Sequence, residues 1–309
     1  MSYQQGWIDR PDEVDAVLAT LPMPRFCTAA PGLTGTSKGK DALFWRAEEK
    51  VLGKRLPANH QTRGTCVSQG FGRGAQDVKL IDIAIHKEPE EWRGEVATEP
   101  IYAGSRVEVG RGQLGANEDG SVGAWAAKWV QDWGILLRQK YGKWDFTRPD
   151  DELAAQLGSP RAGVPDELEP IAREHPIKTV SLAKTGEEAA DGLSNWYPLP
   201  ICSSQGFTEV RDSNGFCKPK GTWYHCMVGR GFCTVKGNRP AVPIQQSWGN
   251  LSPTGNDKVT LESGEDIILP EGVFLVDLEV IDKMVRQGDS FLLSGFVGFP
   301  SQQLDHVLI

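Results

Sequence analysis

The chain has 309 residues, of which 39% are hydrophobic and 24% charged, with a formal charge of −8. These values suit a globular protein that buries a large core as one large domain or two small ones. The acidic balance and the absence of clustered Lys and Arg argue against a nucleic-acid partner. No apolar stretch approaches the roughly 18 residues of a membrane helix, and no signal peptide opens the chain, so we expect a cytoplasmic protein without a membrane partner.

Six cysteines are too few for a disulfide scaffold in a chain of this length. No C-x-x-C pair occurs, and the last four cysteines, spaced by 15, 9 and 7 positions, fit no usual zinc pattern. We therefore expect no metal and no cofactor, and interpret most of these cysteines as small hydrophobic residues on buried strands: Cys27, Cys202, Cys217, Cys226 and Cys233.

Taken in chain order, residues 1–56 are expected to form an irregular arm with one short helix over 11–18, where proline and acidic residues occupy the first turn. From Cys66, apolar residues recur every three or four positions as far as Ile85, which predicts a helix with one buried face. Thr65 can cap this helix, so Cys66 is placed in its first turn.

A second helix is predicted from about Gly120 to Gly134, followed by loops and short helices over 146–188. Strands are then predicted over 197–203, 225–235, 241–247, 272–276 and 291–296, with a helix over 278–286 between the last two. Helices first and strands later indicate an α+β protein with two facing lobes.

The position of Cys66 suits nucleophilic chemistry. A cysteine reacts as thiolate, and both a helix N-terminus and a nearby imidazolium lower its pKa. Gly64 allows close approach of a substrate, and the first-turn amides can help to form an oxyanion hole. Of the five histidines only His225 opens a strand that enters the core, while the other four, His60, His86, His175 and His306, lie in polar or loop-like surroundings. An amide side chain on the next strand, Gln246 or its neighbour Gln245, could orient the imidazole.

These residues stand in a pattern that resembles the papain family of cysteine peptidases. The sequence Asn-His-Gln-Thr-Arg-Gly-Thr-Cys at 59–66 resembles the family's approach to its nucleophile, and His-Cys-Met-Val-Gly at 225–229 its histidine strand. Gln-Ser-Trp-Gly at 246–249 resembles Asn-Ser-Trp-Gly, and residues 118–125 resemble the glycine-rich turn before a helix. The separations, 159 residues from cysteine to histidine and 21 more to the amide, are similar to the family's roughly 130–150.

The resemblance covers residues 57–300 and implies a papain-like α+β fold, in which a helical lobe with a central nucleophile helix (57–190) packs on an antiparallel sheet or barrel lobe (191–300). The whole papain-like domain is assigned to 57–309, after the arm of 1–56. Because that arm is short, regulation by removal of a pro-segment is not expected. A narrower resemblance, carried by residues 206–217, 223–227 and 287–291, is to uncharacterised papain-fold proteins of tailed bacteriophages and bacteria.

The resemblance also assigns roles. Cys66 is the nucleophile, His225 the general base, Gln246 the third member of the triad and Gln61 the oxyanion donor, with Trp248, Gly64 and Ser247 in support. Two positions depart from the family pattern: Gln246 replaces asparagine, and Gln61 lies five residues before the cysteine, so that His60 occupies the usual sixth position.

The sequence thus predicts a cysteine hydrolase that acts on a peptide or protein substrate, phage-encoded or virion-associated and in contact with other virion proteins. One alternative is a structural or interaction protein of a phage particle that has lost catalysis. Another is a peptidoglycan endopeptidase.

Overall fold

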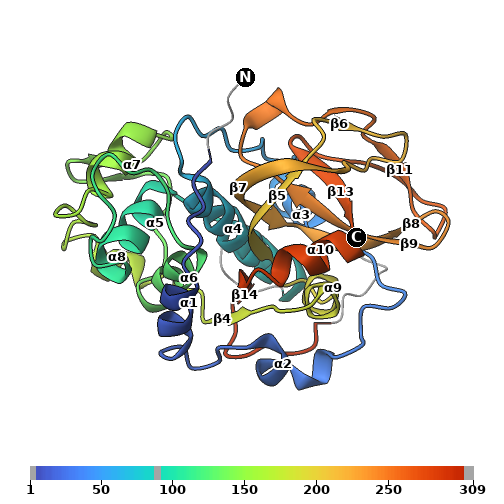
Figure 1. The fold of residues 1–309 in the computed structure, drawn as a ribbon, viewed down its shortest axis with the longest axis horizontal. Coiled ribbons are helices and arrows are strands. Elements are labelled where there is room, and N and C mark those ends of the chain that lie inside the picture. The colour runs from blue at the N-terminus through green and yellow to red at the C-terminus, as the bar shows by residue number, and fades with distance from the viewer. Residues whose placement is uncertain (1–4, 87–91, 303–309) are drawn as a thin grey trace.

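The structure is a computed structural model that describes residues 5–86 and 92–302. Ten α-helices belong to this part of the chain, on either side of the long central helix α4 (Figure 1). They are α1 (Pro11–Leu18), α2 (Phe26–Ala29), α3 (Trp45–Leu52), α4 (Cys66–His86), α5 (Glu99–Gly104), α6 (Gly123–Asp132), α7 (Asp151–Leu157), α8 (Glu169–Ala172), α9 (Gly186–Ser194) and α10 (Leu278–Val285).

The strands follow mostly in the second half of the chain. They are β1 (Ala42–Leu43), β2 (Lys140–Tyr141), β3 (Trp144–Asp145), β4 (Thr179–Leu182), β5 (Leu199–Phe207), β6 (Val210–Arg211), β7 (Pro219–Gly229), β8 (Gly231–Val235), β9 (Arg239–Gln245), β10 (Thr254–Gly255), β11 (Lys258–Thr260), β12 (Asp266–Ile268), β13 (Val273–Asp277) and β14 (Asp289–Ser294). The main sheet has the order β1-β8-β9-β7-β5-β14-β4, and β13 pairs with β9. The pairs within it are antiparallel.

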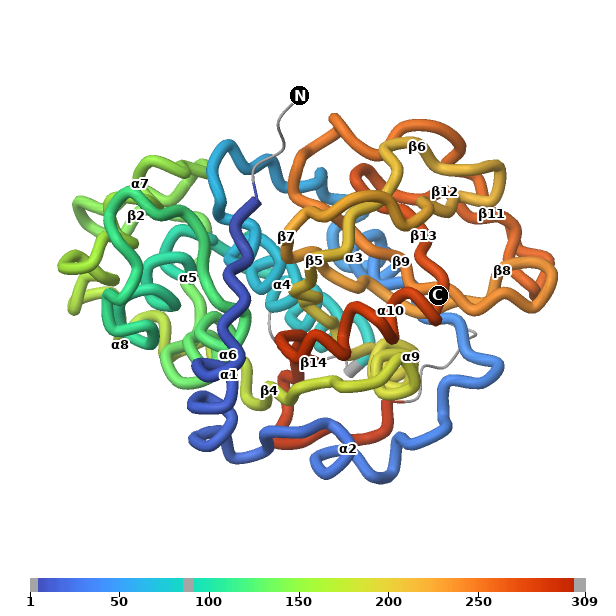
Figure 2. Tube along the Cα trace, viewed as in Figure 1, coloured from blue at the N-terminus to red at the C-terminus, as the bar shows by residue number. Residues whose placement is uncertain are grey.

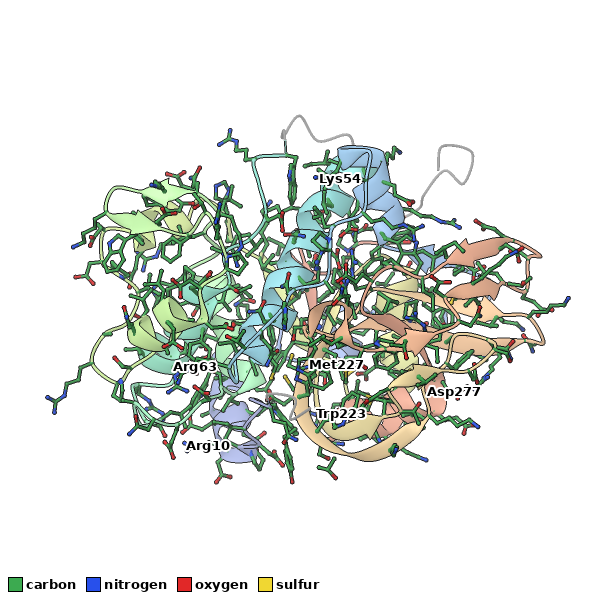
Figure 3. All side chains as sticks on the ribbon, turned by 90° about the horizontal axis from the view of Figure 1, so that it is seen from above. Arg10, Lys54, Arg63, Trp223, Met227 and Asp277 are labelled. Carbon is green, nitrogen blue, oxygen red and sulfur yellow. The ribbon has the colours of Figure 1, made fainter. Side chains whose placement is uncertain are left out.

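Helix α4 packs closely against both halves of the molecule because glycines recur along it. A Cβ atom added to Gly72 would lie 2.7 Å from the side chain of Thr98, on the helical side. One added to Gly70 would lie 2.7 Å from the sulfur of Cys226, on strand β7. The nucleophile helix of the sequence prediction therefore lies where the helical and β halves meet. Viewed from above, Arg63 lies on the helical side of α4, and Trp223 and Met227 on the β side (Figure 3).

A buried ionic cluster fastens the sheet to the helices. The Arg230 guanidinium, between β7 and β8, donates hydrogen bonds to Asp77 of α4 at 2.6 and 2.8 Å and to Glu48 of α3 at 2.7 Å. All three side chains are at most 1% exposed. Because charges so deeply buried are tolerated only when paired, this cluster fixes α3 and α4 against the strands.

The sequence-based helices over 11–18, from Cys66, before Gly134 and over 278–286 are confirmed to within a few residues, as are the main strands. Strand β4 and helix α5 were missed, and so were α3 and β1, which lie in the expected irregular arm. Strand β1 pairs with β8, and Trp45 of α3 is 1% exposed, so this part of the arm belongs to the core. None of the described helices is long and apolar enough to cross a membrane.

Candidate active site

The Cys66 thiol lies at the first residue of α4 and is fully buried. The backbone N–H groups of Cys226, Val67 and Gly6 lie close enough to its sulfur to favour the thiolate and so to lower the pKa of the thiol. Burial nevertheless raises the pKa of the thiol well above its ordinary value, because desolvation of a thiolate outweighs these three donors. In this arrangement Cys66 is a neutral thiol, although the backbone N–H groups around its sulfur would stabilise a thiolate.

His225 lies on β7, next to Cys226, and is also fully buried. Its ring stacks on Trp248 with a centroid distance of 4.4 Å, as the predicted shielding role of Trp248 requires. Neither ring nitrogen has a hydrogen-bond partner among the described residues, so the imidazole is not bonded to the Cys66 thiol. Desolvation lowers the pKa of His225 to about 3, which leaves the ring neutral at neutral pH.

The loop after β9 holds Gln246 away from the role that the sequence suggests. Its side-chain NH₂ donates to the carbonyl oxygens of Gly249, at 3.1 Å, and of Ser252, and its side-chain oxygen accepts from the backbone N–H of Trp248. The amide therefore ties its own loop together and makes no hydrogen bond to His225 here. The alternative, Gln245, is bonded to Arg230 and to the Glu271 carbonyl oxygen.

Gln61 is the better placed of the two candidate oxyanion donors. Its side-chain oxygen accepts from the Ser247 hydroxyl at 2.5 Å, its backbone N–H donates to the Ser247 carbonyl oxygen, and its NH₂ donates to the Arg63 carbonyl oxygen at 2.8 Å. His60 instead forms an isolated bridge with Trp248 and is exposed. Ser247 thus joins the loop before Cys66 to the loop beside His225, and the predicted residues gather in one region.

The N-terminal segment, residues 5–8, crosses this region and covers the thiol. Backbone N–H groups of Gly6 and Trp7 donate to the Tyr224 carbonyl oxygen, at 3.2 and 3.0 Å. Ser121 N–H donates to the Gly6 carbonyl oxygen at 2.9 Å, and Ile8 N–H donates to the Ser121 carbonyl oxygen at 3.0 Å. The segment descends between the two halves of the molecule to α1 (Figure 2). The segment thereby links Tyr224, the residue before His225 on β7, to Ser121, in the turn before α6.

Glycine is required at two positions of this crossing. A Cβ atom on Gly6 would lie 2.1 Å from the Gly64 carbonyl oxygen, and one on Gly64 would lie 2.5 Å from the Gln5 carbonyl oxygen. These distances are far inside van der Waals contact, so the two backbones touch directly. From the sequence, Gly64 is expected to allow close approach of a substrate. In the structure, residues 5 and 6 of the same chain make that close approach.

The side chain of Trp7 is buried in the same hydrophobic core cluster as Cys66. It is 3% exposed, and its indole N–H donates to the Asp289 carboxylate at 2.7 Å. The same carboxylate accepts the backbone N–H groups of Gly123 and Ala124, both at 2.7 Å, at the start of α6. Burial raises the pKa of Asp289 to about 7. Sequence reasoning missed both Trp7 and Asp289, because no local pattern connects two residues 282 positions apart.

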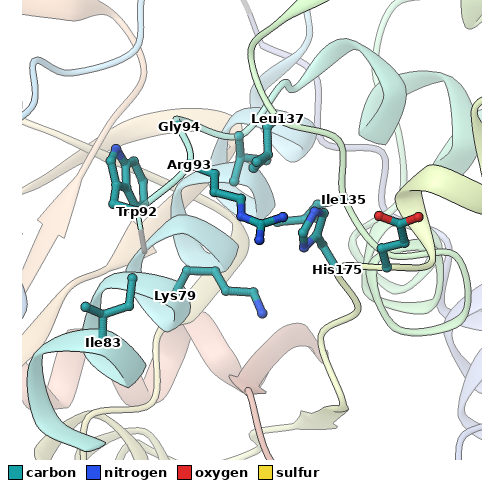
Figure 4. Close-up of a pocket in the computed structure, with 10 residues that line it drawn as sticks. Lys79, Ile83, Trp92, Arg93, Gly94, Ile135, Leu137 and His175 are labelled. Carbon is teal, nitrogen blue, oxygen red and sulfur yellow. The ribbon is translucent and has the colours of Figure 1, made fainter. Parts of the chain in front are cut away.

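A small cavity borders the predicted site residues. A cavity bounded in part by Gly70, Cys226 and Gln246 has a volume of about 10 Å³, room for one water molecule at most. A larger cavity of about 250 Å³ lies toward the other end of α4, lined by Lys79, Trp92, His175 and other residues (Figure 4). Neither Cys66 nor His225 contributes to it, so it is separate from the candidate site.

Known structures share this arrangement of helices and strands. Xylellain, a cysteine protease from Xylella fastidiosa, aligns over 95% of this chain and 93% of its own with a TM-score of 0.52 and 14% sequence identity. The chain has a papain-like fold. Two further similar structures have TM-scores below 0.5: proCathepsin B S9 from Trypanosoma congolense (0.47, 12% identity, 89% of this chain and 86% of that one) and bromelain from Ananas comosus (0.48, 12%, 82% and 98%). No protein-family model and no curated protein matches the sequence.

The predicted α+β, papain-like fold is therefore confirmed. At 14% identity, the likeness to xylellain describes the fold and not the reaction. The roles of Cys66, His225, Gln246 and Gln61 rest on the residues themselves.

Proposed function

We propose that the chain is a cysteine peptidase in which Cys66 is the nucleophile and His225 the general base. The observation that carries the proposal is the position of the Cys66 sulfur. It lies at the start of the central helix of a papain-like fold, among backbone N–H donors, one of which belongs to the residue directly after His225. Such donors stabilise a thiolate and, later, the oxyanion of a tetrahedral intermediate.

The reaction that fits these residues is acyl transfer. The Cys66 thiolate attacks the carbonyl carbon of a peptide bond, and the imidazolium of His225 protonates the departing amine. Water, deprotonated by His225, then attacks the thioester and releases the acid and the thiol. The Cys66 backbone N–H and the side-chain NH₂ of Gln61 are the proposed oxyanion donors, and the Gln61 NH₂ must share or exchange its bond to the Arg63 carbonyl oxygen when substrate binds.

The described arrangement is a closed one. The segment of residues 5–8 occupies the surface above the thiol, and desolvation keeps Cys66 and His225 neutral. Displacement of the segment would admit both water and substrate, and would let the pair ionise to thiolate and imidazolium. Catalysis therefore requires an opening of the N-terminal segment, a displacement that involves no cleavage of the chain.

We assign the orientation of the imidazole to Trp248 together with Gln246. Trp248 stacks on the ring, and Gln246 accepts the Trp248 backbone N–H and thereby fixes the loop that carries it. Gln246 would serve as a direct triad member only if its side chain turned away from Gly249 and Ser252 in the open state.

The test is the rate at which iodoacetamide alkylates Cys66 as a function of pH, in the wild type and in His225→Ala. A nucleophile paired with His225 gives labelling well below the ordinary cysteine pKa of about 8.5, and the variant loses it. If the pH dependence of labelling in both proteins is that of an ordinary thiol, Cys66 is not activated and the proposal is wrong.

A second candidate, a papain-fold structural protein without catalysis, is favoured by the unpaired ring nitrogens of His225 and by the loop-bound amide of Gln246. We propose a virion or cytoplasmic location on the phage resemblance alone, and co-purification with virion proteins that persists in Cys66→Ala would support the structural role. Digestion of purified peptidoglycan by the wild type, and not by Cys66→Ala, would instead identify a cell-wall endopeptidase.

A further inference from the structure

Three buried thiols meet beneath the N-terminal segment. Cys66 comes from α4, Cys202 from β5 and Cys226 from β7, and each is at most 1% exposed. Cys202 and Cys226 are directly opposite each other in an antiparallel pair. Residues opposite each other in such a pair have Cα atoms about 4.5–5.5 Å apart, which is within the range that disulfides span.

Cys226 is also the thiol that adjoins Cys66. Its sulfur packs on α4 at Gly70, four residues after Cys66 and hence on the same face of the helix. Its backbone N–H lies near the Cys66 sulfur, and its side chain is close enough that a charge on one thiol disfavours a charge on the other.

We propose that Cys226 is the resolving thiol of Cys66: when peroxide oxidises Cys66, Cys226 captures the product as a reversible disulfide. The proposal rests on the proposed function, because only an activated Cys66 thiolate reacts readily with peroxide. Packing alone would be satisfied by a small apolar residue such as alanine at position 226. A thiol beside a nucleophile adds a chemical capacity that alanine lacks.

The steps balance with hydrogen peroxide as oxidant and a dithiol as reductant. The Cys66 thiolate attacks one peroxide oxygen, forming the sulfenic acid and releasing hydroxide. The Cys226 sulfur then attacks the Cys66 sulfur, the S–OH bond breaks, and water leaves with the thiol proton. A dithiol such as dithiothreitol returns both residues to thiols and becomes a cyclic disulfide. Without Cys226, further peroxide converts the sulfenic acid to the irreversible sulfinic acid.

The experiment treats the full-length protein with hydrogen peroxide, blocks the remaining thiols and maps the modified peptides by mass spectrometry, before and after dithiothreitol. It compares the wild type, Cys226→Ala and Cys233→Ala, the last of which removes a cysteine from β8 that is equally buried but lies in a different core cluster. Alkylation of unoxidised Cys66 by iodoacetamide is measured alongside. It shows whether each variant is folded and whether Cys66 is activated.

We expect a Cys66–Cys226 cross-link in the wild type and in Cys233→Ala, with alkylation of Cys66 restored by dithiothreitol. Cys226→Ala should give sulfinic Cys66 and lose that recovery. Sulfinic Cys66 in the wild type, or a cross-link from Cys66 to any other cysteine, would overturn the assignment while leaving the peptidase proposal intact. A Cys66 that resists both iodoacetamide and peroxide would overturn both proposals.

Discussion

Gly6→Ala is the substitution that tests most directly whether the N-terminal segment closes the site. The added methyl group would lie 2.1 Å from the carbonyl oxygen of Gly64, a backbone atom that cannot turn aside as the end of a side chain can. The loop that carries Gly64 is itself held, because Arg63 forms ion pairs with Asp119 and Glu152. The segment must therefore lift away from the site for alanine to be accommodated.

The contacts of residues 5–8 determine the free energy that favours the closed position of the segment. Four backbone hydrogen bonds and the bond from Trp7 to Asp289 hold the segment, each worth about 1 kcal/mol net. Burial of the Trp7 side chain adds about 4 kcal/mol, and ordering each backbone residue costs about 1–2 kcal/mol. The closed state is thus favoured by about 2–3 kcal/mol, and an overpacking cost of about 1–3 kcal/mol cancels it. The open fraction should rise from about one in a hundred to about one half.

The assay is the second-order rate of iodoacetamide labelling at Cys66 near neutral pH, which should increase about 50-fold in Gly6→Ala, in line with the change in open fraction. Gly32→Ala is the matched control, since Gly32 has open space around the position of a Cβ atom. Hydrogen exchange at the amides of residues 6–8 reports independently whether the segment has left Tyr224 and Ser121.

Two results would refute this reasoning. If exchange at residues 6–8 accelerates while labelling of Cys66 stays slow, the segment does not shield the nucleophile. If neither changes, the close approach of Gly6 to Gly64 does not hold the segment in place.

Three further predictions concern the surroundings of the site. Trp248→Ala removes the ring that stacks on His225, an interaction worth about 0.5–1.5 kcal/mol. It should lower the rate of alkylation of Cys66 below pH 8 by about 3–10-fold. An unchanged rate would mean that Trp248 does not position the imidazole. Arg230→Met leaves Asp77 buried without the cation that binds it and leaves Glu48 with its ion pair to Arg73 alone, and should reduce the free energy of unfolding in urea by about 3–5 kcal/mol. Arg286→Met, at an exposed pair, should change it little. Burial raises the pKa of Asp289 to about 7, above its unfolded value of about 3.9, so the folded chain binds more protons between those values and the free energy of unfolding falls as pH rises through that window, by about 4 kcal/mol at most. The pKa of His225 is lowered to about 3, below its unfolded value of about 6.5, so the unfolded chain binds more protons between those values. The contribution of His225 to the free energy of unfolding is therefore lost as pH falls from about 6.5 to about 3. We therefore expect the free energy of unfolding in urea, measured across pH 3–8, to depend less on pH at the acidic end in His225→Phe than in the wild type. In Asp289→Asn it should decline less as the pH approaches neutrality. Profiles that run parallel in the wild type and both variants would contradict both pKa shifts.

The parts of the fold that could be predicted are those that local periodicity encodes. The apolar spacing after Cys66 predicted α4, and the apolar runs predicted the main strands. The single strand expected over 225–235 is instead divided into β7 and β8 at Arg230. The charge of Arg230 is bound by Asp77 and Glu48, residues far away in the sequence, and no local pattern announces that pairing.

The sequence pattern predicted which residues lie in one region of the structure, but not the hydrogen bonds that they form. Spacing placed Cys66, His225, Gln61 and Trp248 near one another, and Ser247 links Gln61 to the loop beside His225. The same sequence pattern could not fix the side-chain rotamer of Gln246, whose longer side chain reaches the carbonyl oxygens of its own loop. The docking of residues 5–8 was equally hidden, since it relies on backbone hydrogen bonds that depend on geometry and not on residue type.

One movement could therefore change the charge state of both reactive residues. Desolvation is the largest cause of the raised pKa of Cys66 and the cause of the lowered pKa of His225, and the N-terminal segment is part of what excludes water. Its departure removes the Gly6 N–H from the sulfur, a loss that by itself raises the pKa of the thiol. The donors from Val67 and Cys226 remain, however, and the larger desolvation penalty is relieved. The pKa of the thiol must then fall while that of the imidazole rises, and both changes favour transfer of the proton from Cys66 to His225.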